Sequence, residues 1–94
     1  MEFCKTVSNV AVSKDKLYSM PVDGVEGKVG VEFSIIGRKS DLQFRVYKDR
    51  ILIYYAVSNV EDISSSFCLD IVDTGKIRFV VNQDAVITFK IYNL

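Results

Sequence analysis

The amino-acid sequence predicts an all-β fold, an antiparallel β-sandwich or small closed barrel of seven to eight strands. Apolar and polar residues alternate through most of residues 28–93, which is the period of half-buried strands. Val and Ile contribute 23 of the 94 residues and Ala and Leu only eight, a balance that favours strands over helices. Short polar turns separate the alternating segments. We expect one domain spanning residues 1–94.

Two strands are expected before the regular part of the chain. A strand over about 2–12 changes parity between its first and last valines, which predicts a β-bulge near Ser8 and Asn9. A charged turn follows, and then a short strand over about 17–22, in which Pro21 predicts an edge position.

Residues 28–58 predict the first of two three-stranded meanders. A four-residue loop would set Phe33 opposite Phe44, and a two-residue turn at 48–49 would set Phe44 opposite Ile53. In this register the residues that alternate inward on the three strands, such as Phe33, Phe44 and Ile53, fall on one side of the sheet.

Residues 66–93 predict the second meander in the same way. A three-residue loop that ends in Gly75 would set Leu69 opposite Phe79, and the next turn would set Phe79 opposite Ile87. Each meander has one apolar face, and stacking the two sheets buries both faces. The large inward residues are expected to fill the interior, which disfavours a ligand-binding lumen.

The composition excludes several classes of function. Twelve basic and twelve acidic residues give a net charge of zero, which disfavours binding to nucleic acid or an anionic membrane by bulk charge. The sequence has no histidine, and its carboxylates are scattered through turns rather than gathered in one acidic loop. We therefore expect a protein that is not an enzyme and that holds no metal or cofactor.

The location of the protein and the state of its thiols follow from simple patterns. No run of 18 apolar residues exists, and the first residues lack the apolar core of a signal peptide, so a cytoplasmic protein is expected. Cys4 and Cys68 are spaced too widely for a metal-binding or redox pair. Two reduced, half-buried thiols are the expectation, and a disulfide between them is the alternative.

One face of the first meander is the candidate partner-binding site. The predicted register places two tyrosines, two arginines, a leucine and a glutamine together on its outward side, a composition typical of protein-binding hot spots. Three interpretations remain open: an ordinary solvated face in which Glu32 neutralises an arginine, a protein-binding surface, or a platform for single-stranded nucleic acid. The six residues are Gln43, Arg45, Tyr47, Arg50, Leu52 and Tyr54.

The outward face of the second meander is the candidate oligomer interface. It would expose an apolar strip of a kind that monomers rarely leave open. Either the N-terminal strands cover this strip or a second subunit does so in a homodimer. The residues are Cys68, Val72, Val80 and Val86.

These observations favour a small cytoplasmic protein-binding module. It would act by occlusion rather than chemistry, as an inhibitor, adaptor or immunity-type protein, and its composition suggests a phage or viral accessory protein. The alternatives are a self-assembling structural subunit, in a virion or a homo-oligomer, and a protein that binds single-stranded nucleic acid. Another protein is the expected partner, a nucleic acid the less favoured one, and no membrane partner is expected.

Overall fold

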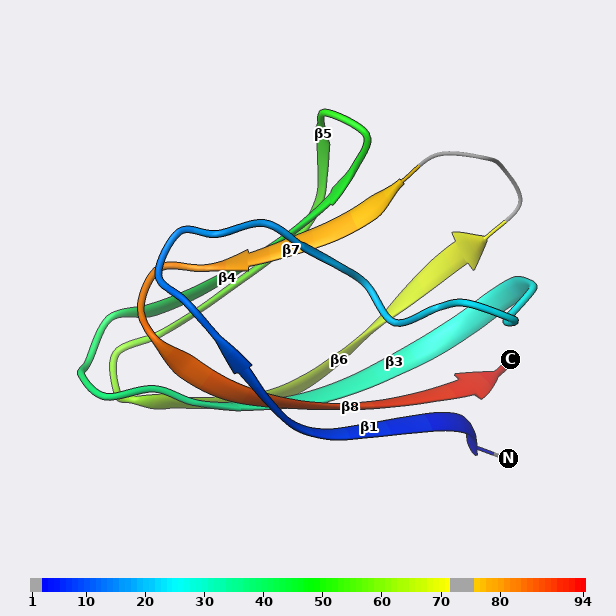
Figure 1. The fold of residues 1–94 in the computed structure, drawn as a ribbon. Coiled ribbons are helices and arrows are strands. Elements are labelled where there is room, and N and C mark those ends of the chain that lie inside the picture. The colour runs from blue at the N-terminus through cyan, green and yellow to red at the C-terminus, as the bar shows by residue number, and fades with distance from the viewer. Residues whose placement is uncertain (1–2, 72–75) are drawn as a thin grey trace.

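The computed structural model describes residues 3–71 and 76–94, which form strands and turns (Figure 1). None of these residues belongs to a helix that could cross a membrane. The strands are β1 (Phe3–Val12), β2 (Tyr18–Ser19), β3 (Gly27–Ile36), β4 (Leu42–Lys48), β5 (Ile51–Ser58), β6 (Asp62–Ile71), β7 (Ile77–Val81) and β8 (Ala85–Asn93).

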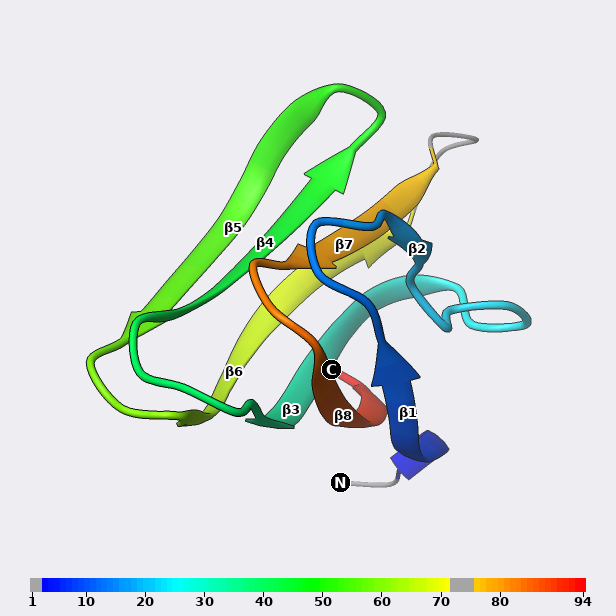
Figure 2. The same ribbon diagram turned by 60° about the vertical axis from the view of Figure 1, so that its left-hand side comes forward.

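The eight strands form two antiparallel sheets that pack face to face. The first sheet has the order β1-β8-β3-β6, and the second has the order β2-β7-β4-β5. Figures 1 and 2 show the two layers, with β7, β4 and β5 above and β1, β8, β3 and β6 below. The predicted all-β sandwich is confirmed.

The connections between strands differ from the two predicted meanders. Every connection except β4–β5 joins strands that lie in opposite sheets, which is the strand order of a jelly roll. β3 pairs with β6 and β8 rather than with β4, and β7 pairs with β2 and β4 rather than with β6 or β8. The predicted pairs at three of the four turns are therefore wrong, and the turn expected at 73–75 lies outside the described residues.

An inward-facing apolar residue is expected both where two strands pair side by side in one sheet and where they pack across the core from opposite sheets. The apolar pattern alone therefore does not distinguish meanders from the observed topology. Phe33 and Phe44 illustrate this point. They were expected side by side in one sheet, but they belong to different sheets and meet across the core, with ring centroids 4.5 Å apart. The predicted pair of Glu32 with Arg45 is lost for the same reason, since Glu32 lies opposite Ser66 and Lys90.

The β4–β5 hairpin forms as predicted but in another register. Its turn is Asp49-Arg50 rather than 48–49, and Asp49 adopts the left-handed region with φ of 55°, which aspartate tolerates. A further register shift lies between Val46 and Tyr47. Phe44 consequently faces Ala56 instead of Ile53, and the inward parity of β5 is reversed from Tyr54 to Ser58.

The N-terminal strands take edge positions. β1 pairs with β8 and its register shifts between Val7 and Val10, where Asn9 has φ of 55°, so the predicted bulge is confirmed. β2 pairs with β7 at the edge of the second sheet, as Pro21 indicated. Because both strands extend sheets sideways, they do not cover an outer face, contrary to the expectation for the candidate oligomer interface.

The core lies between the sheets and is built from the residues that alternation placed inward. Phe44 is fully buried, and its ring lies 5.9 Å from that of Phe79 and 6.4 Å from those of Phe67 and Phe89. The other side chains with almost no exposure are Val29, Val31, Ile35, Leu42, Val46, Val81, Ile87 and Ile91.

One polar side chain is buried with this core and holds the β3–β4 crossover. Gln83 follows β7, and its Oε1 accepts hydrogen bonds from the backbone N–H groups of Arg38, at 2.7 Å, and Lys39, at 3.0 Å. Its Nε2 donates to the carbonyl of Lys39 at 2.9 Å. A Cβ at Gly37 would lie 2.5 Å from that Oε1, so the loop needs a glycine where it passes the amide.

Candidate functional site

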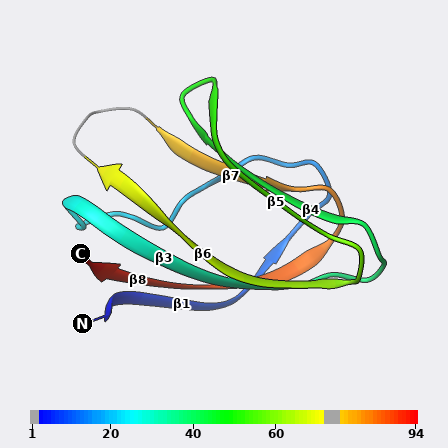
Figure 3. The same ribbon diagram turned by 180° about the vertical axis from the view of Figure 1, so that it is seen from behind.

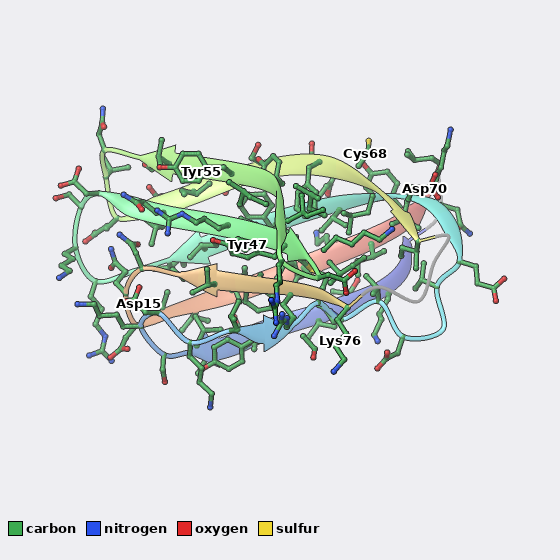
Figure 4. The ribbon with its side chains drawn as sticks, turned by 90° about the horizontal axis from the view of Figure 1, so that it is seen from above. Asp15, Tyr47, Tyr55, Cys68, Asp70 and Lys76 are labelled. Carbon is green, nitrogen blue, oxygen red and sulfur yellow. The ribbon has the colours of Figure 1, made fainter. Side chains whose placement is uncertain are left out.

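The outer faces of the two sheets differ in chemistry. The first sheet carries a depression of about 330 Å³ whose lining is mostly small hydroxyl and charged side chains, among them Ser34, Ser64 and Thr88. The second sheet exposes tyrosine, arginine and aliphatic side chains instead. Figure 4 views the molecule onto the second sheet, with Tyr47 and Tyr55 labelled on it. The second face is therefore the candidate site.

Arg45 lies at the centre of this face in a restrained position. Its Nη2 donates a hydrogen bond of 3.0 Å to Oε1 of Gln43, and its guanidinium lies 5.6 Å from the ring centroid of Tyr55. In the sheet it lies between Tyr55 on β5 and Val80 on β7. A guanidinium held by a stacked ring and an amide loses little side-chain entropy when it binds a partner.

A shallow depression of about 380 Å³ opens beside Arg45. Its floor is partly apolar, and three arginines against two aspartates give it a net charge of +1. Such a mixture suits a carboxylate that arrives with apolar neighbours. The lining residues are Asp15, Leu17, Arg45, Tyr47, Asp49, Arg50, Arg78 and Val80.

Arg78 is the least satisfied polar side chain of the depression. Its Nη2 donates to the carbonyl of Asp49 at 3.3 Å. Its Nε is buried, and none of the described residues accepts a hydrogen bond from it. A buried donor without a partner costs free energy.

The turn of the β4–β5 hairpin is tied to β7 at this end of the sheet. The Asp49 N–H donates to the carbonyl of Lys76 at 2.8 Å, and the Asp49 carboxylate accepts from the Lys76 N–H at 3.1 Å. These two hydrogen bonds fix the turn that carries Arg50 against the start of β7. Tyr18 lies on β2, at the edge of the second sheet opposite β5. Its hydroxyl accepts a hydrogen bond from the Ser13 N–H at 2.8 Å. Hydrogen bonds with the side chain and backbone of Ser13 lower the pKa of Tyr18.

The structure places most of the predicted site residues on this face, with one exception. Gln43, Arg45 and Tyr47 lie on the outer side of β4, and the hairpin brings Arg50 and Leu52 to its end. Tyr54 does not belong with them. Its ring points into the sandwich and stacks on Phe67 at 4.3 Å, so its assignment to the binding face is wrong.

Tyr54 closes one side of the sandwich, and this role gives a stability prediction. Its ring joins the second sheet to Phe67 of the first, and its hydroxyl lies 3.5 Å from that of Ser65. We expect Tyr54→Ala to lower the free energy of unfolding by about 2 kcal/mol, through lost burial and ring stacking. Tyr54→Phe should cost less than about 1 kcal/mol, since the hydroxyl bond is long and exposed. Urea denaturation of both variants measures the difference, and equal losses would contradict the stacking role.

Tyr55, Arg78 and Val80 belong to the site but were not assigned to it from the sequence. Tyr55 is 47% exposed and takes the place that was expected for Tyr54. Arg78 and Val80 reach the face because β7 pairs with β4, as Tyr47 opposite Arg78 and Arg45 opposite Val80. The alternation in β7 did show that both point outward.

The predicted oligomer strip does not exist as one surface. Val80 lies on the second sheet, whereas Cys68 and Val86 lie on the first. Cys68 is opposite Gly30 and Val86 is opposite Ile36, which separates them along β3 by about 20 Å. Val72 lies outside the described residues. The assignment is wrong because it rested on a pairing of β6, β7 and β8 that does not form.

The strand order also decides how the two cysteines are related. Cys68 is free and exposed rather than half-buried. Cys4 lies in β1 and is separated from β6 by β8 and β3, so three strand spacings, about 14 Å, lie between them. Their Cα atoms are too far apart for a disulfide within one chain, which needs less than about 7 Å. The described residues contain no group of three or more acidic, cysteine or histidine side chains placed to hold a metal ion.

Comparisons with known proteins add little to this geometry. No protein-family model and no curated protein matches the sequence. One solved structure to which the chain is similar comes from work stating that Bacillus endospore appendages form a novel family of disulfide-linked pili. The two chains are 11% identical, the match covers 95% of this chain and 88% of that chain, and the TM-score is 0.47. A likeness at this level does not extend to function.

Proposed function

We propose that this protein is a small, non-enzymatic binding module that engages an acidic protein partner through the outer face of the second sheet. The restrained position of Arg45 between Gln43 and Tyr55 is the observation that supports this proposal most directly. The module would work in the cytoplasm by occlusion, as an inhibitor or adaptor does, because the face offers binding groups rather than a reactive constellation.

The chemistry of the face suggests what the partner presents. Arg50 and Arg78 flank the depression beside Arg45, and Val80 and Leu17 supply apolar surface between them. Arginine recognises carboxylates through a planar pair of donors. A partner segment with an Asp or Glu next to an aliphatic or aromatic side chain would satisfy both parts of the depression.

Charge reversal at Arg45 tests the proposal. We expect Arg45→Glu to weaken partner binding about 30-fold or more, the effect of losing a central hot-spot residue. Its stability should change by less than about 1 kcal/mol, because the side chain is on an outer face. The measurement is a pull-down from lysate of the source organism, with tagged wild type and variants as bait, and with nuclease treatment in parallel.

Arg38→Glu is the matched control. It makes the same change of charge on an exposed loop, in a separate depression with Lys14 and Lys39. A protein retained by wild type and by Arg38→Glu, lost with Arg45→Glu and insensitive to nuclease, would support the proposal. Equal retention by all three baits would refute it. A nuclease-sensitive complex whose affinity falls steeply with salt would instead indicate binding of nucleic acid.

A further inference from the structure

The four edge strands of the sandwich are not equally protected against pairing with another chain. β1 has two register shifts, and β2 has only two residues and is followed by Pro21. β6 carries Asp62 and Asp70 near its ends. These features are typical of edges that resist the addition of a strand. Figure 2 shows β5 as the outermost strand on its side of the second sheet.

β5 has one register shift, at Ile53, and beyond it the strand from Tyr54 to Ser58 lacks such protection. Its sequence from Ile51 to Ser58 contains no charged residue, no proline and no glycine. Four of its aliphatic side chains are well exposed, with Ile51 at 69%, Val57 at 58%, Leu52 at 48% and Ile53 at 41%. Among the described residues only β4 pairs with it, so one side of its backbone presents unpaired N–H and C=O groups. An extended strand is the structure that satisfies such a row of groups.

We propose that two copies of this chain pair through β5 in antiparallel orientation and form a twofold dimer with one continuous eight-stranded sheet. β5 suits a second β5 because it has no charges to place opposite one another. A twofold register about Tyr55 would set the two Tyr55 residues opposite each other, and each Tyr54 opposite Ala56 of the other copy, within the regular part of β5. In this register the outer faces of the two paired sheets form one continuous face. Aromatic and β-branched residues also make favourable cross-strand pairs.

The charges at the two ends of β5 support the same orientation. Lys48, Asp49 and Arg50 lie at the turn before β5 and carry a net charge of +1, whereas Glu61 and Asp62, both exposed, lie just after β5. In an antiparallel pair the basic turn of one copy lies beside the acidic segment of the other, twice by symmetry. A parallel pair would instead bring like charges together. Figure 3 shows the β4–β5 turn extending beyond the rest of the sandwich, where a second copy can reach it.

Sedimentation equilibrium over a range of concentrations tests the dimer. The wild type is expected to move from 10.6 kDa towards twice that mass as its concentration rises, and to stop there. Val57→Lys should weaken the dimer at least tenfold, because a lysine on an edge strand opposes strand addition. Val86→Lys is the matched control, since Val86 is 40% exposed on the outer face of the first sheet. Thermal denaturation verifies that both variants fold.

A cysteine placed on the expected axis gives an independent readout. In a chain with Cys4→Ser and Cys68→Ser, Tyr55→Cys should form a disulfide-linked dimer on oxidation, whereas Thr88→Cys should not. A monomer at every concentration, association unaffected by Val57→Lys, or growth beyond the dimer would overturn the proposal. Arg45→Glu should dimerise like wild type, so the dimer and the proposed partner binding can fail separately.

Discussion

Phe44→Ala is expected to lower the free energy of unfolding by about 3–5 kcal/mol. Phe44 has no exposed surface and lies where both sheets meet, with the ring of Phe33 4.5 Å away and that of Phe79 5.9 Å away. Alanine would leave a cavity bounded by rings from five other strands, and these rings cannot collapse into it without moving the sheets. For a domain of this size the loss is a large part of the total stability.

Urea denaturation monitored by circular dichroism measures the effect. Phe44→Leu is the control, because it keeps most of the volume and should cost about 1–1.5 kcal/mol. A loss below about 1 kcal/mol for Phe44→Ala would show that the core adapts to the missing ring. It would then contradict the view that this ring is the central contact between the sheets.

Gln83→Leu is expected to cost about 2–3 kcal/mol, although leucine is the more apolar residue. Gln83 is only 3% exposed and satisfies the N–H groups of Arg38 and Lys39 and the carbonyl of Lys39. Leucine supplies none of these bonds, so three backbone groups beside the core would lose their partner. The amide protons of residues 38 and 39 should also exchange faster with solvent, which localises the effect to the crossover loop.

Gln43→Leu is the matched control for this substitution. The side chain of Gln43 is on the outer face, where it accepts a hydrogen bond from Arg45. We expect its replacement to change stability by less than about 0.5 kcal/mol. If both variants lose the same free energy, the loss at Gln83 would reflect a general preference for glutamine rather than the three bonds.

The inward faces of the strands could be predicted from sequence, but the partners of the strands could not. Alternation showed that Leu69 and Phe79 are buried, and both are. It did not show that β3 pairs with β6 and β8. Strands pair through backbone hydrogen bonds, and the identity of the side chains that face the core does not reveal which strands are paired. Pairing successive strands is the natural first assumption. In this jelly roll, β4 and β5 are the one pair of successive strands described that lie side by side in a sheet.

The candidate site shows a second limit of the same reasoning. The positions of Arg45 and Tyr47 followed from the alternation within β4. The segment from Ile51 to Val57 is apolar at both parities, so its pattern contains no information about which residues face inward. The bulge beside Val46 reversed the parity of β5 from Tyr54 onwards, which exchanged Tyr54 for Tyr55 on the outer face. Only coordinates could resolve that exchange.

The topology also has a consequence for how the chain reaches its native state. The β4–β5 hairpin is the one pair of neighbouring strands that can close locally, on a timescale of about 1–10 μs. Every other ladder joins segments that are distant in sequence, such as β1 with β8, so most loop-closure entropy is lost before those contacts form. Folding is therefore expected to be slow, on the order of milliseconds to seconds. During that interval both faces of the apolar β5 are exposed, because β6 has not yet packed against it, and the chain is then prone to aggregation.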